Sequence, residues 1–160
     1  MKLLDHYFSL FTQMKFLVYL MGKLKIPMIG YVKPTLLELD DNTVRIKIRL
    51  RRRTKNHLNS MYFGVLAVGA DLAAGAHAFY YAKKDGLQIS FAFKDFHADF
   101  IKRPETDVIF EMNEGLEIKE SFEQAKKEQQ RVNKKVQVKA FNENGEQVPF
   151  FELTASIKCV

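Results

Sequence analysis

Hydrophobic and polar residues alternate with period two through several short stretches of the chain, which is the pattern of half-buried β-strands. In residues 43–51 the apolar side chains take one face and the cationic side chains take the other. Such a division is typical of an antiparallel strand with one side in water. Residues 35–39 precede this stretch across the polar sequence Asp40-Asp41-Asn42, so the two segments predict a β-hairpin.

The second half of the chain predicts four further strands. Residues 89–100 alternate as well, but the phase of the alternation changes near Lys94-Asp95, which predicts a β-bulge. Asn144-Gly145 is expected to turn the last hairpin, because this dipeptide favours tight turns between strands. The other three strands are expected over residues 108–112, 132–140 and 151–157.

Two internal stretches have helical character. Residues 61–79 are mostly glycine and alanine, which predicts a thin buried helix that other backbone can approach closely, with one carboxylate, Asp71, near its middle. Residues 117–130 are charged, with apolar residues at helical spacing, and predict a short surface helix. Only the first helix is apolar enough to cover the strands, so we expect an α+β fold in which one curved antiparallel sheet wraps around it.

Length and composition indicate one folded domain over residues 1–160. The chain has 47% hydrophobic and 28% charged residues, which is ordinary for a folded protein. Cys159 is the only cysteine, so neither an internal disulfide nor a cysteine-based zinc site can form. The four histidines lack metal-ligand spacing. We therefore expect no metal and no cofactor, and a cytoplasmic location fits the single thiol.

Two apolar segments resemble membrane spans in length. Residues 1–22 predict an amphipathic N-terminal helix, but Asp5 and His6 interrupt it and no cleavage motif follows, so a secretory signal is a poor fit. The glycine/alanine helix carries Asp71 and His77, and an acid at the centre of a span costs about 2.5 to 3.5 kcal/mol. We expect neither segment to cross a membrane, while attachment of the first helix to a membrane surface remains an alternative.

The stretch from Asn56 through Tyr62-Phe63-Gly64 to Asp71 resembles the hotdog fold of the phenylacetate-type acyl-CoA thioesterases, and is most similar to a thioesterase-like branch of that superfamily. Those proteins have an Asn, a His-Gly-Gly turn at the helix start and an acid on the central helix, in this order. Residues 100–107, with Pro104, resemble the strand, proline turn and acid that follow. The resemblance covers most of the chain from about Lys33 onward and implies a hotdog fold.

The resemblance also implies a catalytic site for thioester hydrolysis. Asp71 would activate water, Asn56 would orient substrate or water, and the backbone amide of Phe63 or Gly64 would stabilise the oxyanion, since a helix start favours negative charge. Tyr62-Phe63 replaces the usual His-Gly. A non-catalytic acyl-CoA or fatty-acyl binding protein is therefore the alternative function. Structural roles also stay open, with Asp71 as a partly exposed helix carboxylate and Asn56 as a helix cap.

Further residues are assigned to substrate binding. By resemblance, Tyr62 would contact the substrate and Ser90 would lie near the bound water, although a serine on a strand is usually structural. Arg52, Arg53 and Lys55 lie in the loop that leads to the site and would meet the phosphates of coenzyme A. The net charge of +6 and a pI near 9.3 also suggest nucleic acid, but no stacking aromatics or recognised motif accompany the basic run, so we do not expect it.

The spacing of the site residues predicts an oligomer. Asp71 follows Gly64 by seven residues, which on a helix is nearly the same face but about 10 Å farther along the axis. One carbonyl carbon cannot contact both groups. If Asp71 acts on a substrate that a helix start polarises, that helix start belongs to another subunit, so we expect a homodimer or a dimer of dimers with shared sites.

Overall fold

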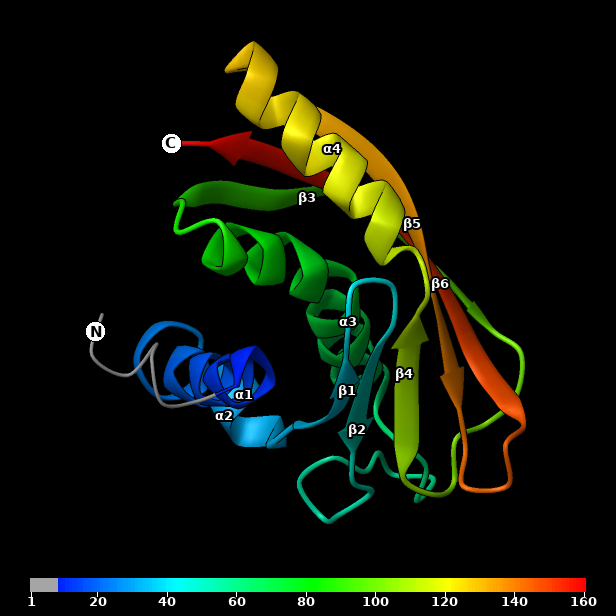
Figure 1. Cartoon of the computed structure of the whole chain (residues 1–160). Helices are drawn as coiled ribbons and strands as arrows, with labels where there is room; N and C mark the ends of the chain where they lie inside the picture. The colour runs from blue at the N-terminus through cyan, green and yellow to red at the C-terminus, as the bar shows by residue number, and fades with distance from the viewer. Residues whose placement is uncertain (1–8) are drawn as a thin grey trace.

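A six-stranded sheet curves around one long helix in the computed structural model, which describes residues 9–160 (Figure 1). The strand order is β1-β2-β4-β5-β6-β3, and every neighbouring pair is antiparallel. This architecture confirms the expected α+β fold. The strands are β1 (Thr35–Leu39), β2 (Val44–Ile48), β3 (Ile89–Phe100), β4 (Val108–Met112), β5 (Val132–Phe141) and β6 (Gln147–Cys159).

The central helix is α3 (Phe63–Lys84), and it is as thin as its composition predicts. Gly69 lies under the ring of Phe110, so that a Cβ atom there would overlap the ring. At Gly75 a Cβ would lie 3.2 Å from Cε1 of Phe91. Although α3 is long and apolar enough to cross a membrane, most of it is buried within the protein, which identifies it as the core helix of this fold.

The strand predictions agree closely with the structure. β1 and β4 have the predicted bounds, and the register between β3 and β6 shifts between Phe93 and Phe96, where the phase of the pattern changed. Gly145 turns the hairpin between β5 and β6 with a φ of 77°, a backbone conformation that favours glycine. The period-two pattern therefore located both the strands and the bulge.

The second helix of the sheet, α4 (Gly115–Glu128), contributes more to the core than we expected. Ile118, Phe122 and Ala125 are fully buried, and the helix packs on β5 and β6 beside α3 (Figure 1). The expectation that α3 alone covers the sheet was wrong. β5 and β6 are long strands, and α4 supplies the apolar stripe that covers part of their inner face.

Residues 10–32 form an N-terminal helical hairpin that packs against α3 and β1. Residues 1–8 of the predicted N-terminal helix lie outside the described part of the chain. The two arms cross where Gly22 meets Gly30, since a Cβ on Gly22 would lie only 2.7 Å from the backbone nitrogen of Gly30. The hairpin consists of α1 (Leu10–Leu20), the π-helical turn η1 (Met21–Lys25) and α2 (Pro27–Val32).

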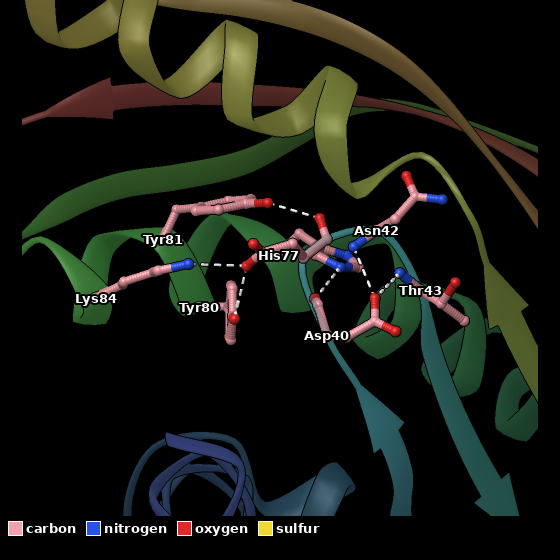
Figure 2. A network of polar contacts seen from close by, with 8 residues as sticks. Asp40, Asn42, Thr43, His77, Tyr80, Tyr81 and Lys84 are labelled. Carbon is pink, nitrogen blue, oxygen red and sulfur yellow. Dashed lines mark hydrogen bonds and ion pairs between the residues drawn. The ribbon is translucent and has the colours of Figure 1, made fainter. Parts of the chain in front are cut away.

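A polar network joins the β1–β2 turn to the second half of α3 (Figure 2). The side chain of His77 is fully buried, and its Nε2 donates to the Asp40 carbonyl at 3.0 Å. Tyr80 donates to the Asp41 carboxylate at 2.8 Å, and Tyr81 donates to the Asp41 carbonyl at 2.6 Å. Burial is the main reason that the pKa of each tyrosine rises to about 12. The network therefore fixes the turn to the central helix with neutral groups on the helix side, apart from Lys84, which pairs with Asp41.

Candidate active site

An apolar cavity of about 250 Å³ lies between the N-terminal hairpin, the β1–β2 hairpin, α3 and the start of β3. Among residues 9–160, Asp71 is the only charged residue in its lining. Apolar lining with one convergent polar group is typical of a small-molecule site. The lining side chains from the hairpin are Met14, Leu17, Val18, Met21, Ile26 and Ile29, and those opposite include Phe79, Phe91 and Phe93.

Asp71 is exposed to solvent and also lines the cavity, so its carboxylate lies at the boundary between water and the apolar lining. No described residue donates a hydrogen bond to it or pairs with it within residues 9–160. Burial among these neighbours raises the pKa of Asp71 above its usual value of 3.8. An unpaired carboxylate with a raised pKa is a stronger base than an ordinary surface aspartate, which suits proton abstraction from water.

The start of α3 presents two free backbone donors. Tyr62 is the N-cap, and its side chain makes no capping hydrogen bond. The amides of Val65 and Leu66 donate to the Tyr62 carbonyl, whereas those of Phe63 and Gly64 have no partner in the described structure. These two amides point out of the positive end of the helix dipole, so they can stabilise an anion.

The aromatic pair at the helix start lies against Gly64. The Tyr62 ring lies so close that a Cβ on Gly64 would stand 2.7 Å from its Cε1 atom. The Tyr62 and Phe63 rings contact each other with centroids 4.8 Å apart, and both are well exposed. Tyr62-Phe63 therefore changes the side chains at this turn and leaves its free amides in place.

Asp71 and the helix start do not meet within one chain. Neither Phe63 nor Gly64 lines the cavity that holds Asp71. Asn56 does not line it either, because its side chain closes the loop before α3: Oδ1 accepts from the Leu58 amide at 2.9 Å. Its Nδ2 donates to the Ser60 hydroxyl at 3.0 Å. The structure thus places Asn56 where it fixes the loop that leads into the helix.

Ser90 lies on the face of β3 that points away from the cavity. Successive side chains of a strand alternate between faces, and Phe91 takes the cavity side. The Ser90 hydroxyl accepts a hydrogen bond from Nη2 of Arg131 at 2.8 Å. In this chain Ser90 is therefore part of a surface pair between β3 and the start of β5, at a distance from Asp71.

The three predicted phosphate-binding cations lie in the loop after β2. Arg52 and Arg53 line a shallow pocket together with Tyr31 of the N-terminal hairpin. Arg53 donates to the Tyr31 carbonyl at 3.2 Å and stacks over its ring. The backbone of Lys55 forms an isolated antiparallel β-bridge with Met61 just before α3. The loop thus joins the helix start to the hairpin and presents its cations to solvent.

The part of the hairpin that lines the cavity was not among the predicted site residues. Met14, Leu17, Val18 and Met21 recur at spacings of three and four residues, so they fall on one side of a helix. That spacing could have identified one face of α1 as a binding surface. It could not show which element the face meets.

The fold is shared with solved proteins. A candidate thioesterase from Shewanella oneidensis matches over 92% of this chain and 99% of its own, with a TM-score of 0.80 and 11% identity. A probable thioesterase of unknown function from Pseudomonas aeruginosa matches over 90% and 95%, with a TM-score of 0.74 and 19% identity. A thioesterase from Haemophilus influenzae matches over 82% of each chain, with a TM-score of 0.62 and 11% identity. The chain therefore has the hotdog fold of thioesterase-like proteins.

The family can be stated more closely. Residues 15–158 match the family described as a domain of unknown function, DUF4442, and the chain belongs to it. A search of curated proteins found no match. The match includes most of the N-terminal hairpin, so the cavity lining from this hairpin, apart from Met14, lies within the family domain.

Proposed function

We propose that this protein hydrolyses the thioester of an acyl-CoA or a related acyl carrier. The observation that supports this function is the unpaired Asp71 carboxylate in an otherwise apolar cavity. The cavity offers a place for the acyl group, and Asp71 offers a base beside it. The solved proteins of the same fold that are described as thioesterases support the same class of reaction.

In the proposed reaction, Asp71, the helix-start amides and the loop cations each have one role. Asp71 takes a proton from water, and the water oxygen forms a bond to the thioester carbonyl carbon. The free amides at a helix start stabilise the oxyanion. The oxyanion then collapses, the C–S bond breaks, and the thiolate leaves and takes up a proton. The loop cations Arg52 and Lys55 lie at the surface, where they would hold the phosphates of coenzyme A.

The free edge of β3 supports the proposal that two chains share each site. Within the described residues, β3 has only one neighbouring strand, β6. Phe96 and Phe100 of β3 are strongly exposed. A long exposed edge strand with aromatic residues is prone to pair with another chain. A second copy is the simplest partner, because a twofold axis brings two identical edges together.

Antiparallel pairing of two β3 strands would complete the site. The start of β3 supplies Phe91 and Phe93 to the Asp71 cavity. The segment after its end approaches the start of α3, since the Pro104 carbonyl accepts from the Met61 amide at 2.8 Å. In an antiparallel pair the end of one strand lies beside the start of the other. The helix start of the second copy would therefore approach this cavity.

A mixed-dimer experiment tests hydrolysis and sharing together. Asp71→Asn removes the base. Phe63→Pro removes one amide at the first helical position, which accepts proline, and Tyr62 already has the extended ψ of 137° that a residue before proline needs. Each variant alone should lose about 100-fold or more in turnover of an acyl-CoA panel. Phe63→Ala, which keeps the amide, is the control and should stay active.

Mixing the two inactive variants decides whether sites are shared. If the base and the amide come from different chains, random mixing should restore about a quarter of wild-type activity, because one site of each mixed dimer is intact. No recovery would place both groups in one chain. If Phe63→Pro alone is fully active, the Gly64 amide is the donor and Gly64→Pro takes its place in the mixture.

A non-catalytic acyl-CoA binding protein is the second candidate function. The exposed Tyr62-Phe63 pair at the helix start favours it, because these rings stand where the thioester would approach the amides. Wild-type protein that binds acyl-CoA in calorimetry but shows no hydrolysis of the panel would establish this function. The free thiol of buried Cys159 fits the cytoplasm as the place of action in either case.

A further inference from the structure

The N-terminal hairpin has a second, outward surface that shares only Ile26 with the cavity lining. Three aliphatic side chains are exposed along its tip: Leu24 is 72% exposed, Met28 55% and Ile26 40%. Large aliphatic side chains gathered at one exposed tip have no role in the fold, since the buried residues Met14 and Ile29 already attach the hairpin to the core. The aromatic residues exposed on the same hairpin are Phe16, Tyr19 and Tyr31.

The charge around this tip is of one sign. Residues 9–34 and 49–55 together hold nine of the 25 lysine and arginine residues and none of the 19 acidic residues. The two segments are adjacent, because Arg53 bonds and stacks with Tyr31. The rest of the chain therefore has an excess of acidic residues, and the positive charge is concentrated on this side of the molecule.

Exposed aliphatic and aromatic residues close to many cations are the features that one kind of partner would bind. The headgroups of an anionic lipid leaflet attract lysine and arginine, and the acyl boundary takes up aliphatic and aromatic side chains. Nucleic acid would use the cations but not Leu24 or Met28. A second copy of this surface would be repelled by its own charge. We propose that the hairpin docks this protein on an anionic membrane surface.

The cavity lies directly behind the docking surface. Ile26 belongs to both, since it lines the cavity and is also exposed at the tip. On a bilayer, the part of the cavity wall formed by Ile26 would lie near the acyl chains of the leaflet. Docking itself needs neither Asp71 nor hydrolysis, so it can be measured separately from the proposed reaction.

Flotation with lipid vesicles tests the docking. Wild-type protein should bind vesicles of phosphatidylcholine with phosphatidylglycerol, bind phosphatidylcholine alone at least about tenfold more weakly, and lose binding as salt rises. The double variant Lys23→Glu, Lys25→Glu should lose about tenfold or more. Glycerol phosphate at millimolar concentration should not compete, which separates a lipid surface from a site for a free phosphate.

A second double variant separates lipid from other polyanions. Leu24→Ser with Met28→Ser keeps every charge and changes only exposed side chains, so it should fold normally and lose vesicle binding about tenfold or more. Leu116→Ser, at an equally exposed position on α4, is the control and should bind as wild type does. Equal binding of wild type to both vesicle types, full binding by the serine variant, or tighter binding to a DNA duplex than to anionic vesicles would each overturn the proposal.

Discussion

Gly69 on the central helix supports the ring of Phe110 from β4 directly on its backbone. Both residues are buried, and Phe110 is fully enclosed, so this contact has no room to relax. The sheet can therefore approach α3 more closely here than any other residue would allow. The contact makes Gly69 a test of how tightly the sheet wraps the helix.

Gly69→Ala should destabilise the protein by about 1 to 3 kcal/mol, because overpacking outweighs the gain of about 1 kcal/mol in helix propensity. Gly75→Ala is the matched control. Its Cβ would meet the Phe91 ring at 3.2 Å, and this partly exposed ring can move. Urea unfolding should show a clear loss for the first variant and little change for the second. Equal effects would mean that the Phe110 contact is not the reason for the glycine.

Asp71→Asn should raise the melting temperature at pH 7 while it abolishes hydrolysis. The folded pKa of Asp71 is raised by burial, so the charged form is favoured more in the unfolded chain. This group therefore begins to cost stability as the pH rises past the unfolded value near 3.8, the full cost is present above the folded pKa, and the neutral amide avoids it. Glu120→Gln, an exposed acid on α4, should change neither quantity. A lower melting temperature for Asp71→Asn would show that the carboxylate has a stabilising partner.

His77 should make the fold sensitive to mild acid. Burial lowers the pKa of His77 below its usual 6.5, although the Asp40 carbonyl and the nearby carboxylates of Asp40 and Asp41 oppose the shift. The unfolded chain takes up a proton first, so stability should fall as the pH drops below about 6.5 and level off below the folded pKa. The carboxylates of Asp40 and Asp41 have lowered pKa values, so their effect begins only near 3.8 and below.

Replacing His77 by glutamine tests whether His77 causes this pH dependence. His77→Gln can still donate to the Asp40 carbonyl but cannot titrate, so the loss of stability between pH 6.5 and 5 should be smaller in the variant. Denaturant titrations across this range measure the difference. An unchanged pH dependence would assign it to other groups.

Arg52 and Lys55 should affect only substrates that carry phosphates. The double variant Arg52→Ala, Lys55→Ala is expected to raise KM for an acyl-CoA several-fold with little change in kcat, because each exposed cation contributes modestly and is screened by salt. An acyl thioester of N-acetylcysteamine lacks the phosphates and is the matched control substrate. Its KM should not change. An equal rise for both substrates would mean that the loop acts through the fold.

The sequence predicted much of the sheet because buried and less buried positions alternate strictly in β2 and β4, whereas β1 departs from the alternation at a register shift between Leu36 and Glu38. The same alternation could have predicted where Ser90 lies. Because Phe91 and Phe93 take the inner face of β3, the neighbouring Ser90 takes the outer face. The resemblance suggested a role that the alternation argues against. For His77 the sequence left two environments open, solvent contact or a hydrogen bond in the core. It could not decide between them, because the hydrogen-bond partner Asp40 is 37 residues away.

The site was harder to predict than the fold. Asp71 could be singled out because an acid among glycines and alanines is unusual, and the free amides at Phe63 and Gly64 follow from any helix start. The cavity could not be predicted, because its walls come from four segments, the N-terminal hairpin, the β1–β2 hairpin, α3 and β3, that only the folded chain brings together. The contribution of α4 to the core was underestimated because its charged residues outnumber the three apolar residues that enter the core.

The cavity wall from the N-terminal hairpin comes from a stretch of sequence that contains none of the proposed catalytic groups. Under the proposed function, substrate choice and chemistry would therefore be encoded in separate segments of the chain. Relatives could acquire new acyl-chain preferences through changes in residues 10–32 while Asp71 and the start of α3 stay the same. Grafting this hairpin between family members should transfer chain-length preference, with turnover of the preferred substrate retained.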